Sequence, residues 1–150
     1  MTTQAKDLSG GIPIAREYVL SDRPDAGVRD AVNVWIEEEN GAFALRLGVE
    51  AVAEEWDRHE LWLDLVFPDG RLYQRRIAAD TQSAIGPEGL PTIRATGPMA
   101  FRCVDPFHIW TAQYDGKAEA LSAQFLIDRP SPDESALVHV DLGIDVTMTM

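Results

Sequence analysis

The sequence predicts an all-β protein that folds as an antiparallel, up-and-down β-barrel of about eight strands. From residue 31 onward, apolar and polar side chains alternate with a period of two, which is the pattern of half-buried strands. Turn signals such as Asn40-Gly41 and Pro68-Asp69-Gly70 separate the alternating segments. An open sheet of this many strands would expose its edges. Closure into a barrel is therefore expected, with a two-sheet sandwich as the alternative.

The strands are expected within residues 31–150, and residues 1–30 are expected to form an irregular lead-in. The lead-in contains several glycines and prolines that would interrupt a helix, and its residues 15–20 are expected to cover one end of the barrel. The alternating pattern defines the expected strands, which are 31–36, 43–50, 61–67, 71–78, 99–103, 107–114, 119–127 and 137–150.

Four segments lie between these strands and carry different signals. Residues 51–60 are charged and are expected to form a loop or a single helical turn. Residues 79–98 are the longest break, and a loop of this length is often a lid or mouth. Asp115-Gly116 is expected to be a hairpin turn, and residues 129–134 a turn that contains proline.

Composition narrows the class of protein. The chain has 150 residues, 45% hydrophobic and 25% charged, which suits a single domain with a real core. Its net charge of −12 disfavours nucleic acid and anionic membranes as partners, because both are negatively charged. No apolar run approaches the ~20 residues of a membrane span. A lone cysteine, Cys103, allows no internal disulfide and fits a reducing compartment, so a cytoplasmic location is expected.

The expected strand faces predict an apolar interior. The strand carboxylates fall on the outward faces, whereas general acid–base catalysis needs a proton donor inside the pocket. An apolar lining favours a hydrophobic small molecule as the ligand. The sequence shows no phosphate-binding loop, no G-x-S-x-G motif and no histidine pair at zinc spacing, so no cofactor and no metal is expected.

Ring-bearing side chains that could point inward supply the candidate ligand-binding residues. These candidates are His108, Trp110, Tyr114, Phe101, Tyr73 and Phe43. The first three share one side of the segment 107–114, where an imidazole, an indole and a phenol could orient a ligand or relay a proton. The alternative is that the aromatic residues are ordinary packing residues with satisfied polar tips, and that His108 is a structural histidine.

Two tryptophans, Trp35 and Trp62, lie on faces opposite the apolar stripes. Exposed tryptophan side chains indicate a contact surface, so a second barrel domain or a homodimer is expected to pack against them. A strand assignment that is wrong by one residue is the alternative, because it would turn both side chains inward. The sequence stops at Met150 inside an apolar alternating pattern, and we therefore expect it to be the first part of a longer polypeptide.

Two stretches carry a resemblance to a known family. Leu65-Val66-Phe67-Pro68-Asp69-Gly70-Arg71 resembles the strand–turn hairpin of lipocalin-like proteins of the AttH and hydroxyneurosporene synthase (carotenoid hydratase) group. Asp105-Pro106-Phe107-His108-Ile109-Trp110, followed by Tyr114-Asp115-Gly116, is similar to a second segment of that group. The resemblance covers about residues 32–127, and Trp110, Tyr114 and Gly116 are the positions that match.

This resemblance implies a lipocalin-like barrel, and it implies that the chain is the first of two barrels in tandem. It also implies an apolar ligand such as a terpenoid, a carotenoid or a steroid. Some relatives add water to isoprenoid double bonds, and others are cyclases. Three hypotheses therefore stand together: a barrel that binds a hydrophobic small molecule, a hydratase or cyclase with His108 or Tyr114 as its polar handle, and a structural barrel that packs on a partner.

Overall fold

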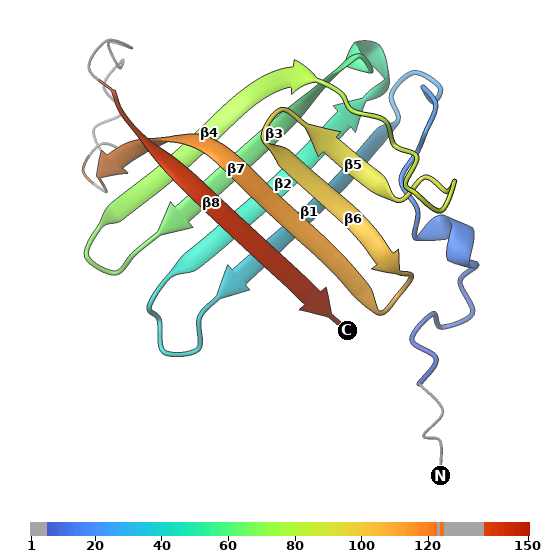
Figure 1. Ribbon diagram of the computed structural model, residues 1–150, viewed down its shortest axis with the longest axis horizontal. Helices are drawn as coiled ribbons and strands as arrows, with labels where there is room; N and C mark the ends of the chain where they lie inside the picture. Colours follow the sequence, from blue (N-terminus) through green and yellow to red (C-terminus); the bar gives the residue numbers. More distant parts are fainter. Residues whose placement is uncertain (1–5, 123, 125–136) are drawn as a thin grey trace.

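The computed structural model describes residues 6–122, 124 and 137–150. Within this part of the chain, eight strands form one antiparallel sheet (Figure 1). The strands are β1 (Arg29–Glu37), β2 (Ala44–Val52), β3 (Arg58–Val66), β4 (Arg71–Asp80), β5 (Ile93–Thr96), β6 (Met99–Asp105), β7 (Ile109–Ser122) and β8 (Val138–Thr149). Two short 3₁₀ turns accompany them, η1 (Ile14–Arg16) and η2 (Ala53–Glu55). No helix among the described residues is long and apolar enough to cross a membrane. The predicted all-β, up-and-down fold is confirmed.

The sheet curls into a barrel-like shape but does not close. Its strand order is β1-β2-β3-β4-β7-β6-β5, and β8 pairs with the other edge of β7. In Figure 1, β1 to β4 run across β5 to β8 at a steep angle, and the two halves join where β4 meets β7. β1 pairs only with β2 and β8 only with β7 among the described residues. An open seam therefore separates these two edge strands.

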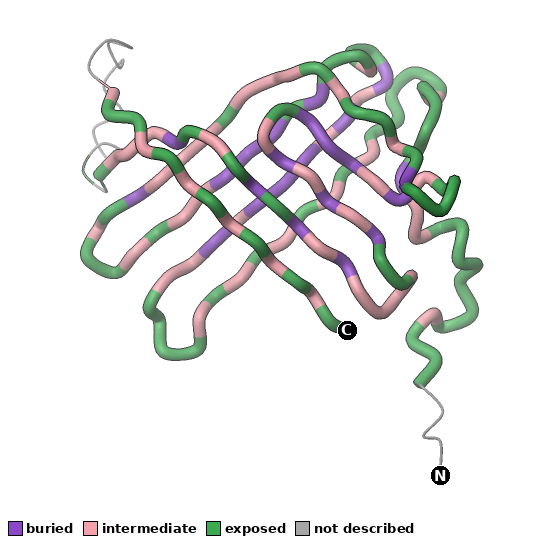
Figure 2. Tube along the Cα trace, viewed as in Figure 1, coloured by how far each residue is buried: buried purple, intermediate pink, exposed green. Residues whose placement is uncertain are grey.

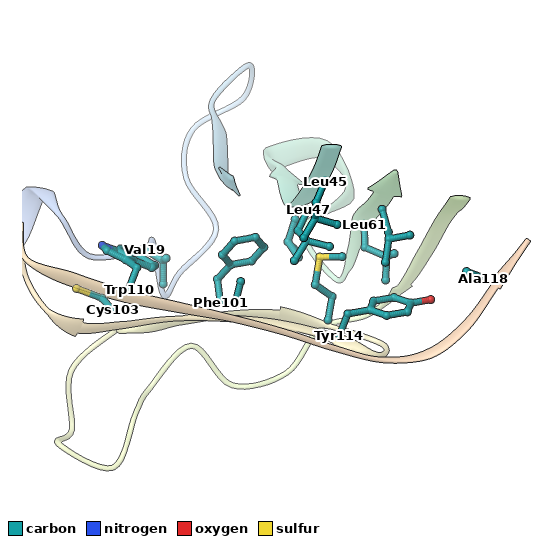
Figure 3. Close-up of a cluster of buried hydrophobic side chains, with 13 residues drawn as sticks. Val19, Leu45, Leu47, Leu61, Phe101, Cys103, Trp110, Tyr114 and Ala118 are labelled. Carbon is teal, nitrogen blue, oxygen red and sulfur yellow. The ribbon is translucent and has the colours of Figure 1, made fainter. Parts of the chain in front are cut away.

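The core fills the space between the two halves. Figure 2 shows the buried residues gathered along the middle of the strands. Figure 3 shows Leu47 and Leu61 from one half directed toward Phe101 and Tyr114 from the other, and all four side chains are at most 1% exposed. Full burial of each such apolar side chain contributes about 1.5–3 kcal/mol. The apolar inward faces therefore form a packed core.

The expected hairpin at Asp115-Gly116 is wrong. β7 (Ile109–Ser122) continues through both residues, so parts of the two strands expected at 107–114 and 119–127 belong to one strand. Residues 123 and 125–127 lie outside the described chain. A Cβ on Gly116 would lie only 2.8 Å from the Cβ of Pro98, and the N–H of Asp115 donates to the Pro98 carbonyl. The glycine therefore allows a close approach of two chain segments and does not form a turn. The turn expected at 129–134 also lies outside the described residues.

The long break expected at 79–98 contains an additional strand. β4 continues to Asp80, and β5 (Ile93–Thr96) pairs with β6. The hydroxyl of Thr96 donates to the carbonyl of Ala79 over 2.8 Å, which ties β5 to the end of β4. The intervening loop is bridged between Ile85 and Pro91. The break is therefore an ordered part of the sheet. The single helical turn expected within 51–60 is present as η2.

Residues 19 and 20 of the lead-in are anchored to one end of the sheet. Val19 is 4% exposed and belongs to the core, and its N–H donates to the Pro91 carbonyl. The N–H of Leu20 donates to Asp30 over 2.8 Å, and Arg94 donates to the Leu20 carbonyl over 2.9 Å. Arg94 also forms an ion pair with Asp30. Polar contacts from β1 and β5 therefore hold the lead-in against the sheet.

Candidate functional site

A cavity of about 400 Å³ lies at the open seam, next to the lead-in. Its walls come from residues 16–19 of the lead-in, residues 30–33 of β1, Trp110 of β7, and Met148 and Met150 at the end of the chain. We call it the mouth cavity. Ligand pockets in proteins commonly measure about 300–1,000 Å³, so this volume suits one small molecule. The cavity has walls from both β1 and the β8 region, which do not pair with each other.

Trp110 connects the cavity wall to the lead-in. Its indole Nε1–H donates to Glu17 Oε1 over 2.7 Å, and the side chain is 8% exposed. β7 positions the indole, because Trp110 pairs with Cys103 on one side and Met148 on the other. η1 positions the carboxylate, because the N–H of Glu17 donates to the Ile14 carbonyl and closes the turn. A hydrogen bond to a carboxylate is stronger than one between neutral groups.

The mouth cavity combines apolar walls with a polar side. Val19, Val32, Trp110 and Met148 supply apolar surface, with Val19 in the core and Val32 and Met148 packed against it. The cavity's polar lining residues are Arg16, Glu17 and Tyr18 of the lead-in and Asp30 and Asn33 of β1. Mostly apolar pockets with a few placed polar groups bind a ligand through its apolar body and orient it through its polar end.

Of the six predicted ligand-binding residues, Trp110 is the one that lines the mouth cavity. Phe101 and Tyr114 lie inside the packed core at 0% and 1% exposure. The Tyr114 hydroxyl donates to the Lys117 carbonyl over 2.6 Å, and burial raises the pKa of this phenol. Tyr114 is therefore a packing aromatic with a satisfied polar tip.

His108 lies in the turn before β7, outside the strand that carries Trp110 and Tyr114. The expected strand start at 107 is wrong, because β7 begins at Ile109 and Phe107 has a φ of 64° in the turn before it. The N–H of His108 donates to the Asp105 carbonyl, and its own carbonyl accepts the N–H of Met150. The left-handed backbone of Phe107 costs energy because this residue carries a side chain. The tight β6–β7 connection imposes this conformation.

Tyr73 lies on β4 and Phe43 lies just before β2, and neither lines the mouth cavity. Tyr73 pairs with Leu65 across β3 and β4, and its ring meets the ring of Phe67 edge-on at 6.0 Å. Phe43 precedes β2, and its carbonyl accepts the N–H of Glu38 in the β1–β2 hairpin. Both side chains pack partly buried against the core. The six candidates therefore do not form one pocket.

A buried polar cluster lies beside the lead-in, and neither the strand pattern nor any motif predicted it. Arg94 is 2% exposed and forms an ion pair with Asp30, a residue of the mouth cavity wall. Its guanidinium also stacks on the ring of Trp56. His59, at 3% exposure, meets Trp56 edge-on, and burial together with the charge of Arg94 lowers the pKa of its imidazole. This cluster supports one wall of the cavity.

Sequence reasoning missed most of the mouth cavity. Glu17 and Trp110 are 93 residues apart, and no pattern near either residue indicates the other. The expectation that 15–20 covers one end of the barrel was the available signal for the lead-in. Met148 falls within the strand expected at 137–150, but the open seam of the sheet beside it was not predictable from alternation.

The outward tryptophans differ in exposure. The register pairs Trp35 with Arg46 and Trp62 with Gly48, which places both indoles on the outer face as expected. Trp35 is 69% exposed, but Trp62 is only 9% exposed, so the expectation that both are exposed is wrong for Trp62. Its ring lies over Gly48, and the guanidinium of Arg46 stacks 4.5 Å from the Trp35 ring and 5.0 Å from the Trp62 ring.

Cys103 is a buried core residue at 2% exposure. Burial raises the pKa of its thiol to about 11, so the reactive thiolate is scarce at neutral pH. This thiol therefore offers no nucleophile to the neighbouring mouth cavity.

Comparison of the chain with family models, with curated proteins and with solved structures gave no match. The resemblance to the AttH and hydroxyneurosporene synthase group therefore stays a prediction. What the chain shows is an open, antiparallel eight-stranded sheet among its described residues, with a cavity at its seam.

Proposed function

We propose that the chain binds an apolar small molecule in the mouth cavity. One observation carries this proposal: Val32 of β1, Trp110 of β7 and Met148 of β8 line, together with polar residues of the lead-in and of β1, a cavity of about 400 Å³. The ligand's apolar body would contact Val32, Trp110 and Met148. A hydroxyl or carbonyl at its end would face the polar lead-in. Terpenoid, steroid and polyketide-like molecules have this chemistry.

Binding is a better proposal than hydratase or cyclase chemistry for this site. The hydratase or cyclase hypothesis relied on His108 or Tyr114 as a polar handle. His108 belongs to the β6–β7 turn, Tyr114 belongs to the core, and neither lines the mouth cavity. Proton transfer needs its donor within hydrogen-bond reach of the reacting group. The lead-in carboxylate, Glu17, accepts from Trp110 and so holds the cavity wall together.

The second candidate function is packing on a partner, either a second barrel domain or another copy of the chain. The exposed ring of Trp35 favours it, because it stands on the outer face beside a further cavity of about 350 Å³ that Arg46, Asp64 and Val66 also line. Exposed aromatic and arginine side chains are enriched at protein interfaces.

The binding proposal is tested by native mass spectrometry before and after organic extraction, followed by titration with a panel of terpenoids, steroids and polyketides. Val32→Phe, which fills the cavity, is expected to weaken binding at least tenfold. Val34→Phe is the matched control, because it enlarges the next inward position of β1 outside the cavity lining. A protein that retains nothing and binds no panel member rejects the proposal, as does a Val32→Phe variant with unchanged affinity.

A further inference from the structure

β1 is an edge strand, and its pairing with β2 shows which of its main-chain N–H and C=O groups point away from β2 toward the free edge. The hydrogen bonds from Glu38 N–H to Phe43 and from Ala53 N–H to Val28 lie at the two ends of this ladder. Hydrogen-bonded pairs alternate along an antiparallel ladder, so the even-numbered residues of β1 direct their main-chain groups toward β2. The odd-numbered residues direct theirs to the free edge. They are Arg29, Ala31, Asn33, Trp35 and Glu37.

This edge lacks the features that usually prevent strands from pairing with other chains. Natural edge strands carry proline, lysine, bulges or inward charges, or another element covers them. β1 has no proline, lysine or bulge, and its inward charge, Asp30, is paired with Arg94. No hydrogen bond from the described residues reaches the outward main-chain groups of β1. Trp35 is 69% exposed on this strand.

We propose that two copies of this chain associate by antiparallel pairing of β1 with β1, around a two-fold axis at Asn33. Asn33 is the midpoint of Arg29–Glu37, so all nine residues of each strand overlap. In this register Arg29 lies opposite the partner's Glu37, and by symmetry the ion pair forms twice. The large ring of Trp35 lies opposite the small side chain of the partner's Ala31.

When two copies of β1 pair in this antiparallel register, opposite charges face each other and a large side chain faces a small one. Oppositely charged residues directly across an antiparallel pair stabilise it, and like charges destabilise it. Each strand offers five outward residues that donate one hydrogen bond and accept one, so the pair would form about ten main-chain hydrogen bonds. The result is an isologous interface and one sheet that continues from β4 of one protomer to β4 of its partner.

β8 is the other free edge, and its outward residues include Asp141 and Asp145. This edge lacks the matched positive and negative ends that Arg29 and Glu37 give β1. The inference makes the second candidate function specific, because it commits the partner to a second copy. Ala31 and Asn33 of this edge also line the mouth cavity, so ligand binding is tested below in a variant outside that lining.

Sedimentation velocity of the full chain over a range of concentrations tests the proposal. The wild type is expected to shift from monomer to dimer. Arg29→Glu places two carboxylates opposite each other, and Glu37→Arg places two guanidinium groups opposite each other. Each variant is therefore expected to raise the dissociation constant at least tenfold. An equimolar mixture of the two variants restores both ion pairs in a heterodimer, and its dissociation constant is expected to return to the wild-type range.

The mixing experiment separates the intermolecular pair from an effect within one chain. Arg29 also pairs with Glu50 on β2, and mixing does not restore that contact. Asn33→Lys is an independent variant that brings two ammonium groups together at the two-fold axis, and it is expected to give a monomer. Thr147→Lys on the exposed face of β8 is the matched control, and it is expected to leave the dimer unchanged.

Three results would overturn the proposal: a wild type that stays monomeric at every concentration, a dimer that survives in both charge variants, or a mixture that fails to associate while both variants remain folded by circular dichroism. Ligand titration of the Glu37→Arg variant, at a concentration where it is monomeric, keeps the two proposals distinct, because Glu37 lies outside the lining of the mouth cavity. Loss of the dimer with retained binding supports both proposals, whereas a dimer that binds no panel member rejects only ligand binding.

Discussion

Replacing Gly48 with alanine is expected to destabilise the protein, although Gly→Ala inside a strand is normally favourable. The Cβ of residue 48 would lie 2.3 Å from Nε1 and 2.4 Å from Cε2 of Trp62. Both distances are far below van der Waals contact. The indole must therefore leave its position over β2, and its contact with Arg46 changes with it.

Two opposing effects determine the size of the change. Alanine removes the entropic cost of an ordered glycine, which is worth about 0.5–1 kcal/mol in favour of the folded state. Overpacking at a tightly filled site costs about 1–3 kcal/mol. Displacement of the indole also exposes apolar surface of a side chain that is now 9% exposed. We expect a net loss of about 1–2 kcal/mol in the free energy of unfolding.

Urea unfolding followed by far-UV circular dichroism measures this change, and Gly143→Ala is the matched control. Gly143 lies inside β8, and its Cβ would meet nothing within 4 Å. The same substitution there is expected to be neutral or to stabilise by up to about 1 kcal/mol. In a Trp62→Ala background, Gly48→Ala is expected to lose its penalty. Equal effects of Gly48→Ala and Gly143→Ala, or a penalty that persists without the indole, would refute the reasoning.

Three further predictions concern buried groups. Burial lowers the pKa of His59 below its ordinary 6.5, so the unfolded chain binds the proton first as the pH falls. The free energy of unfolding should therefore be unaffected by His59 above pH 6.5 and should decrease below it. Urea midpoints at pH 7.5 and 5.5 measure this decrease, and it should be smaller in His59→Phe. An equal decrease in the wild type and in His59→Phe would contradict the prediction. Arg94→Met leaves Asp30 unpaired and is expected to cost about 3 kcal/mol. It should also make the lead-in susceptible to limited proteolysis, and a lead-in that stays protected would count against the anchoring role. Cys103, with its thiol pKa raised to about 11, is expected to resist alkylation in the folded protein and to react after unfolding in urea; rapid labelling of the native chain would oppose this.

The sequence determined the parts of the fold that depend on local pattern. Alternation fixed which side chains of β2 and β3 point inward, because successive residues of a strand lie on opposite faces. The turns at Asn40-Gly41 and Pro68-Asp69-Gly70 were predictable because glycine readily adopts the positive φ that tight turns need. Gly41 and Gly70 have φ values of 72° and 86°. The outward position of Trp35 follows from the same alternation.

Only the tertiary structure decided the role of Gly116, because a turn glycine and a close-approach glycine look the same in a sequence. Pro98 is distant from Gly116 in the sequence, and a Cβ on Gly116 would lie only 2.8 Å from the Cβ of Pro98. Strand β5 was likewise hidden in a segment that contains several glycines and prolines, and its place depends on pairing with β6.

The candidate site was the least predictable feature. Trp110 was identified from its residue type, but its partner Glu17 lies in the lead-in, 93 residues away. The mouth cavity exists because β1 and β8 end the sheet without pairing with each other among the described residues. A strand's own sequence fixes which faces are apolar. Which strand lies beside it, and whether the last edge finds a partner, depends on the packing of the whole chain, so the fold class could be read from the sequence and the site could not.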